Sequence, residues 1–235
     1  MNPEILLSSF QRIMSSDGVF RRDLESELQI QSLSNPTLYL QSSLMLLHSH
    51  QKIPSDLRLF TIIHLKSLIL ITSFQNAISL QSFLQDLSFL LRSEPNTQIL
   101  SFLSEIYGEI AGKFLKAIDL KNNDLLNNDI WELLSLTENQ RIVAGLDILT
   151  KLVEVSLEEL LTVFKDNLYS IIKKMLEFND PQILKATNRL VTRILSYADY
   201  SLCKKYFPLI PQLLEILFNF LQQQIPEVKE FNVFL

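Results

Sequence analysis

The chain has 235 residues, of which 47% are hydrophobic, and it contains only four glycines and eight prolines. Turns and β-bulges use glycine, so this composition argues against a strand-rich fold and favours helices joined by short loops. The net charge of −5 argues against direct nucleic-acid binding, which needs a basic surface, and the single cysteine excludes an intramolecular disulfide.

Neither a targeting segment nor a membrane span is predicted. The start of the chain, MNPEILLSSFQRIM, has no basic region before an apolar core, as a secretory signal would. The most apolar run, residues 59–74, is interrupted by His64 and Lys66 and is too short to span a bilayer. We therefore expect a soluble intracellular protein without membrane insertion.

Leucine-rich amphipathic segments recur along the chain, and a polar turn and a second amphipathic segment follow all but the last of them. The predicted first helices span residues 3–14, 36–47, 80–91, 129–136, 166–178 and 208–223. The five turns contain acidic residues at successive spacings of 39, 38, 44 and 42, namely Asp17, Asp56, Glu94, Glu138 and Asp180. An acidic side chain there can cap the free N–H groups of the second helix and interact favourably with its dipole.

A helix-pair period near forty residues is typical of HEAT and armadillo arrays. The predicted fold is therefore all-α, a right-handed α-solenoid of about five and a half HEAT-type helix pairs. We expect one array over residues 1–235, with approximate repeats 1–34, 35–75, 76–119, 127–155, 157–198 and an incomplete 200–235. An irregular helical bundle would explain the apolar stripes equally well, but it would not explain five evenly spaced turns.

Two irregular segments interrupt this pattern. Residues 119–129 are rich in Asn and Asp, which favours a loop inside the array. The sequence also ends within a repeat, without the polar capping helix that usually closes a solenoid. We therefore expect an N-terminal piece of a longer protein.

The residues most capable of chemistry form no catalytic or metal-binding pattern. His48 and His50 are two positions apart, so they do not face each other on a helix. His64 lies in an apolar segment and is interpreted as a core or edge residue. Cys203 precedes two lysines that could lower its pKa, but no partner base is evident.

The remaining candidates have structural interpretations. They are Gly108 and Gly112 as close-packing positions in one helix, Trp131 as a core anchor, and Glu158 and Glu159 on a solvated face. No glycine-rich phosphate loop is present. We therefore expect neither an enzyme nor a bound cofactor or metal.

Several segments resemble the importin-β (karyopherin-β) family. The segment SSDGVFRRDLESELQIQ, residues 15–31, is similar to the family's opening helix through Asp17, Val19, Arg21 and Glu25. The segment SDLRLFTIIHLKSLI, residues 55–69, resembles the second-repeat helix through Arg58, Leu65, Lys66 and Ile69. Residues 103–115, 129–136 and 200–217 resemble later helices, the last of them in the branch that imports ribosomal proteins and histones. The chain departs from the family's pattern at Leu24, Thr61, Ile62 and Glu132.

This resemblance implies a nuclear transport receptor found in the cytoplasm, the nucleus and the nuclear pore. Its partners would be the Ran GTPase in its GTP state, Phe-Gly nucleoporins and basic protein cargo. Arg21, Arg58 and Lys66 become candidate Ran-binding positions, and we expect Arg58 and Lys66 to be solvated. The structural alternative is that such a cation pairs with an acid on the adjacent repeat.

Two other functions remain open at this point. One is a HEAT-repeat scaffold or adaptor unrelated to transport, such as a phosphatase regulatory subunit. The other is a helical enzyme, which would need a polar pocket and a role for Cys203 or His64.

Overall fold

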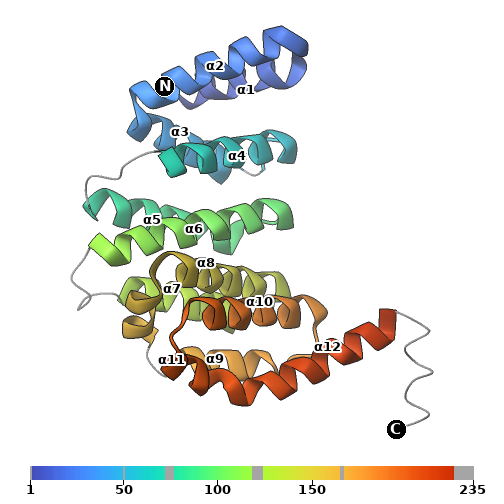
Figure 1. The fold of residues 1–235 in the computed structure, drawn as a ribbon. Helices are drawn as coiled ribbons and strands as arrows, with labels where there is room; N and C mark the ends of the chain where they lie inside the picture. Colours follow the sequence, from blue (N-terminus) through green and yellow to red (C-terminus); the bar gives the residue numbers. More distant parts are fainter. Residues whose placement is uncertain (1, 50, 72–76, 118–123, 165–166, 225–235) are drawn as a thin grey trace. The chain divides into compact units, whose positions relative to one another are not determined.

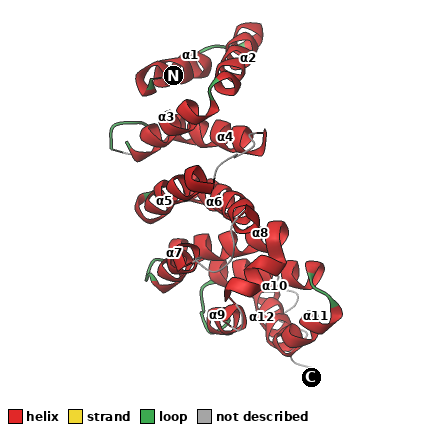
Figure 2. Ribbon diagram, turned by 90° about the vertical axis from the view of Figure 1, so that its left-hand side faces the viewer, coloured by secondary structure: helices red, strands yellow, loops and turns green. Residues whose placement is uncertain are grey.

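The computed structural model describes residues 2–49, 51–71, 77–117, 124–164 and 167–224. All regular structure in these ranges is helical, and no strand occurs among them (Figure 2). The all-α prediction is therefore confirmed. The chain divides into two compact units, Met1–Ala117 and Ile118–Leu235, which are described separately, and the single array over residues 1–235 stays a prediction.

The first unit consists of three consecutive helix pairs (Figure 1). They are α1 (Pro3–Ser15) with α2 (Gly18–Ser34), α3 (Pro36–His48) with α4 (Ser55–Ile71), and α5 (Ala77–Ser93) with α6 (Thr97–Ala117). Besides these pairings, α3 packs between α1 and α5, and α4 packs on α6. The predicted first helices at 3–14, 36–47 and 80–91 are confirmed.

The second unit begins with the helix pair α7 (Asp124–Ser135) and α8 (Asn139–Phe164). It continues with α9 (Asn167–Met175), α10 (Pro181–Tyr197), α11 (Tyr200–Tyr206), the 3-10 turn η2 (Phe207–Leu209) and α12 (Ile210–Gln224). α8 packs against both α7 and α10, and α9 packs on α10. α8 is bent at Ser156, where the backbone leaves helical geometry, so the predicted boundary between repeats 127–155 and 157–198 falls on this kink.

Asparagine or aspartate followed by proline begins three of the helices. Asn2 accepts a hydrogen bond from the Glu4 N–H at 3.0 Å, and Asn35 accepts one from the Leu38 N–H at 3.2 Å. Asp180 accepts from the N–H groups of both Gln182 and Ile183. In each case the proline occupies the first turn, where its missing N–H is harmless.

The prediction that the five acidic turn residues cap the second helices is only partly right. Asp180 caps α10, whereas Asp17 occupies the cap position of α2 without a side-chain hydrogen bond. Asp56 lies inside the first turn of α4, where it still meets the helix dipole. At α6 the cap is Asn96, which accepts from the Gln98 and Ile99 N–H groups. Glu94 does not cap this helix and instead pairs with Arg58.

The loop predicted over residues 119–129 is also partly wrong. Residues 124–129 form the first half of α7, and residues 118–123 lie outside the described ranges. The reason is that Leu126 and Ile130 extend the buried apolar face of α7, and burial outweighs the turn preference of the intervening Asn and Asp residues. Trp131, expected in the core, is half-buried.

Each unit buries its own apolar core. Phe10, Tyr39, Leu47 and Leu65 are among the buried side chains of the first unit, and Leu146, Leu149, Phe164 and Ile172 are among those of the second. The two glycines of α6, Gly108 and Gly112, are buried, as a close-packing role requires. Within the described residues, no helix combines the length and the hydropathy needed to cross a membrane.

Gly145 marks a close approach of α8 to α7. A β-carbon at this position would lie 3.0 Å from Leu134 Cδ2 and 3.4 Å from Leu133 Cβ, and both leucines are buried. We expect Gly145→Val to lower the free energy of unfolding by about 1–3 kcal/mol, because the added methyl groups overlap α7. Urea denaturation followed by circular dichroism measures this change. Gln140→Val, at an exposed position of the same helix, is the control, and equal stability of the two variants would contradict the close contact.

Candidate interaction site

Several ion pairs connect residues that lie 36 to 42 positions apart in the sequence. In the first unit Arg58 of α4 pairs with Glu94, 36 residues later, and Lys66 of α4 pairs with Glu105 of α6, 39 residues later. These pairs join one helix pair to the next. Their spacing matches the period that the acidic turns predict.

The second unit repeats this arrangement between α8 and α10. Arg193 Nε lies 2.9 Å from Glu154 Oε1, and Arg189 Nη1 lies 3.1 Å from Asp147 Oδ1. In addition, Asn139 Nδ2 donates to Asp180 Oδ2 at 2.7 Å across 41 residues. Cations of one helix pair therefore pair with acids of a neighbouring one, and Arg58 and Lys66 behave as the structural alternative expected.

Arg58 is buried, so the expectation that it is solvated is wrong. Its side chain is 4% exposed, and Glu94 as a residue is 2% exposed. The Glu94 carboxylate also accepts the Asn96 N–H at 2.9 Å, so the turn before α6 holds the acid in place over α4. A guanidinium enclosed in this way offers almost no surface to another protein.

Lys66 is only partly solvated. Its side chain is 36% exposed and that of its partner Glu105 is 44% exposed. The Lys66 ammonium also lies 5.3 Å from the centre of the Phe102 ring, within cation–π distance. Both Arg58 and Lys66 therefore hold α4 against the third helix pair.

Arg21 has a different environment, at a groove between α2 and α4. Arg21 is exposed, and its Nε donates to Glu25 Oε1 one turn later at 2.9 Å. The groove has a volume of about 690 Å³. It is lined by Arg21, Arg22, Glu25, Ser26, Gln29, Ser32 and Leu33 of α2, Tyr39 of α3, and Phe60, Ile63, His64, Ser67 and Leu68 of α4. Arg58 and Lys66 are not among these residues, so the three predicted positions do not form one site.

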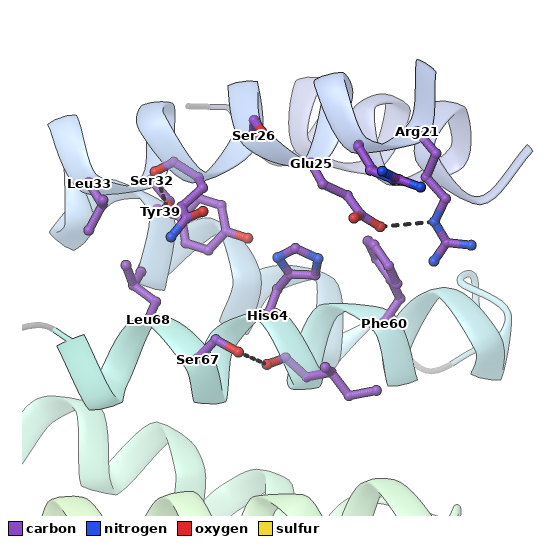
Figure 3. Close-up of a pocket in the computed structure, with 13 residues that line it drawn as sticks. Arg21, Glu25, Ser26, Ser32, Leu33, Tyr39, Phe60, His64, Ser67 and Leu68 are labelled. Carbon is purple, nitrogen blue, oxygen red and sulfur yellow. Dashed lines mark hydrogen bonds and ion pairs between the residues drawn. The ribbon is translucent and has the colours of Figure 1, made fainter. Parts of the chain in front are cut away.

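The two ends of the groove differ in character (Figure 3). Arg21, Glu25 and Phe60 lie at one end, Leu33 and Leu68 at the other, and the His64 ring projects from α4 between them. For ease of reference we call these the arginine end and the leucine end. The α4 members of the lining follow helical spacing, which in the sequence cannot be distinguished from a core-facing stripe.

The floor of the groove, formed by His64 and Tyr39, is uncharged at physiological pH. Burial lowers the pKa of His64, and the nearby Glu25 carboxylate opposes this with a smaller effect. The His64 ring packs against aromatic neighbours, and its centroid lies 4.5 Å from that of Phe60 and 5.8 Å from that of Phe10. Burial also raises the pKa of Tyr39 far above its ordinary value, against a smaller effect of Ser43. The positive charge of the groove therefore lies at its arginine end.

The other chemical candidates do not come together. Cys203 is half-buried, and its Sγ lies 3.7 Å from the carbonyl oxygens of Leu195 and Ala198. His48 is half-buried beside Phe89, and His50 falls outside the described residues. Among the residues that the structure describes, no three His, Cys, Asp or Glu side chains are grouped as metal ligands. The acidic pair Glu158 and Glu159 is exposed and half-buried, respectively.

Comparison of the chain with protein-family models, with characterised proteins and with solved structures found no match.

The burial of the Arg58–Glu94 pair predicts unequal effects of substitution. Arg58→Met should lower the free energy of unfolding by about 3–5 kcal/mol, because it leaves the Glu94 carboxylate buried without its counter-charge. Lys66→Met, at a half-exposed pair, should lower it by less than about 1 kcal/mol. Chemical denaturation of the two variants measures the difference.

A double variant serves as the control for this prediction. Adding Glu94→Gln to Arg58→Met should restore part of the lost stability, because a buried amide is less costly than a buried unpaired charge. The amide oxygen can still accept the Asn96 N–H. Equal losses for Arg58→Met and Lys66→Met would show that Arg58 is solvated.

The lowered pKa of His64 predicts that stability falls in mild acid. The unfolded chain takes up the proton below pH about 6.5, whereas the folded chain takes it up only at lower pH. The free energy of unfolding should therefore decrease as the pH falls below about 6.5. In His64→Phe, which keeps an aromatic ring in the site, this part of the decrease should vanish. An NMR titration that places the His64 pKa at or above its ordinary value would contradict the expectation.

Proposed function

We propose that the chain is part of a nuclear transport receptor of the karyopherin-β type, built as a right-handed HEAT-type α-solenoid. In this role it binds the Ran GTPase in its GTP state, Phe-Gly nucleoporins and basic protein cargo, and it moves between cytoplasm and nucleus through the nuclear pore. The proposal includes no catalytic activity and no cofactor.

One observation provides the main support. Ion pairs link helix pairs at spacings of 36 to 42 residues, close to the repeat length of a HEAT-type array. The specific link to transport rests on the sequence resemblance, above all on residues 15–31. In that segment Arg21 is exposed, so the residue remains available to a partner.

A HEAT-repeat scaffold unrelated to transport is the second candidate. It is favoured by the burial of Arg58 and by the pairing of Lys66, because both residues then have a structural reason to be cationic. A scaffold would bind its protein partners stoichiometrically, and added Ran-GTP would not release them.

Binding to Ran distinguishes the two candidates. The 235-residue chain should bind Ran loaded with a non-hydrolysable GTP analogue at least tenfold more tightly than Ran-GDP, measured by biolayer interferometry. Arg21→Glu should weaken this binding, whereas Arg12→Glu, an exposed charge reversal on α1, should not. Arg58→Glu is unsuitable for this purpose because it would place two carboxylates in a buried site. Equal binding of both nucleotide states, or none, would contradict the transport function.

A further inference from the structure

We propose that the groove between α2 and α4 binds an extended segment of a partner protein, with acidic side chains at the arginine end and an apolar side chain at the leucine end. This inference names a ligand chemistry for one groove and does not depend on Ran binding or on nuclear transport. It applies equally to a transport receptor and to a scaffold.

The charges of the groove favour an anion at the arginine end. Arg21 and Arg22 are both exposed, and Glu25 is the one acid in the lining. Glu25 is paired with Arg21, whereas Arg22 forms no ion pair with any residue that the structure describes. A carboxylate from a partner would complete the charge balance, and a guanidinium can hold it through two parallel hydrogen bonds.

The opposite end favours an apolar side chain. Leu33 is 47% exposed at this end, and Ile63, beside His64 on α4, is 42% exposed, so both present aliphatic surface along the groove. The ring of Tyr39, which is buried, and Leu68 complete this end (Figure 3). A leucine or phenylalanine placed there would remove the exposed aliphatic surfaces from water.

The length of the groove sets the length of the ligand. Arg21 and Leu33 are twelve positions apart on α2, which corresponds to about 18 Å at about 1.5 Å per residue. An extended chain covers about 3.3 Å per residue, so five or six residues would span the two ends. Ser26 and Gln29 are exposed along the wall between them and can hydrogen-bond to the backbone of such a segment.

A protein segment fits these features better than a nucleic acid does. A nucleic acid needs cations along its whole backbone, whereas the cations here are confined to one end and the other end is aliphatic. The chain as a whole is also acidic, with a net charge of −5. An acidic peptide would therefore be repelled by much of the surface and attracted to exposed basic positions such as Arg21 and Arg22.

The test uses a labelled peptide, Glu-Glu-Ser-Gly-Ser-Leu-Phe, and its reversed sequence, because either chain direction fits the groove. Fluorescence anisotropy measures their binding to the 235-residue chain. One direction should bind, and the same peptide with Lys-Lys in place of Glu-Glu should bind at least tenfold more weakly. The ring signals of His64, assigned with His64→Phe, should shift on binding, because the imidazole lies between the two ends of the groove.

Variants at both ends locate the peptide. Arg22→Glu should weaken binding at least tenfold and Arg22→Gln less severely, and Leu33→Ser at the leucine end should weaken it about threefold. Arg12→Glu is the matched charge reversal outside the groove and should change the affinity less than twofold. Circular dichroism confirms that each variant is folded, which is expected because Arg22, Leu33 and Arg12 are exposed.

Three results would overturn the inference: no binding of either peptide at millimolar concentration, equal binding of the lysine peptide, or equal effects of Arg22→Glu and Arg12→Glu. These results are independent of the Ran experiment. Peptide binding without selectivity for Ran-GTP would support the groove and contradict the transport function. Selective Ran-GTP binding without peptide binding would support the transport function and contradict the proposed role of the groove.

Discussion

Ion pairs between residues 36 to 42 positions apart join neighbouring helix pairs within each unit. Apolar packing alone is non-directional, so leucine-rich helices of similar length could meet in several registers. The buried pair of Arg58 and Glu94 in the first unit favours one of these registers, because a different register would leave a charge buried without its partner. Enclosing the Arg58–Glu94 pair requires desolvation that its Coulomb attraction only partly offsets. We therefore interpret its main contribution as selecting which helices meet, with a smaller contribution to stability.

The ion pairs of Arg58 and Lys66 fix how α4 is turned, so that two of its sides have different surroundings. With about 100° of rotation per residue, Arg58 and Lys66 lie on the side that faces the third helix pair. Phe60, Ile63 and His64 lie on the other side, which faces α2. Because Arg58 and Lys66 hold α4 against the third helix pair, Phe60, Ile63 and His64 remain at the surface of the groove. The aromatic packing of His64 with Phe10 and Phe60 then closes the floor, which leaves charge only at the arginine end.

Local patterns predicted the helices well because the sequence spacing and the buried stripes coincide, as at the first helices 3–14, 36–47 and 80–91. The failures occurred where a distant contact determines the outcome. Glu94 has the position of a helix cap, but it is drawn into an ion pair with a residue 36 positions earlier. Residues 124–129 have turn-forming composition, but the apolar face of α7 extends through them. The groove was not predicted, because Phe60, Ile63 and His64 follow the same spacing as a core stripe.

The contrast between Arg21 and Arg58 shows why resemblance alone does not assign a binding role. Both arginines are predicted as partner-binding positions from the resemblance, Arg21 in the segment 15–31 and Arg58 in the segment 55–69, and both occur in the first turn of a second helix. Their environments differ because Arg58 pairs with the buried Glu94, 36 residues later, whereas Arg21 forms a surface pair with Glu25 on its own helix. A surface pair of this kind contributes little stability, so a partner's carboxylate can compete for the guanidinium at small cost. The availability of a cation to a partner is therefore determined by whether the neighbouring helix pair supplies an acid, and in the groove between α2 and α4 it does not supply one to Arg21 or Arg22.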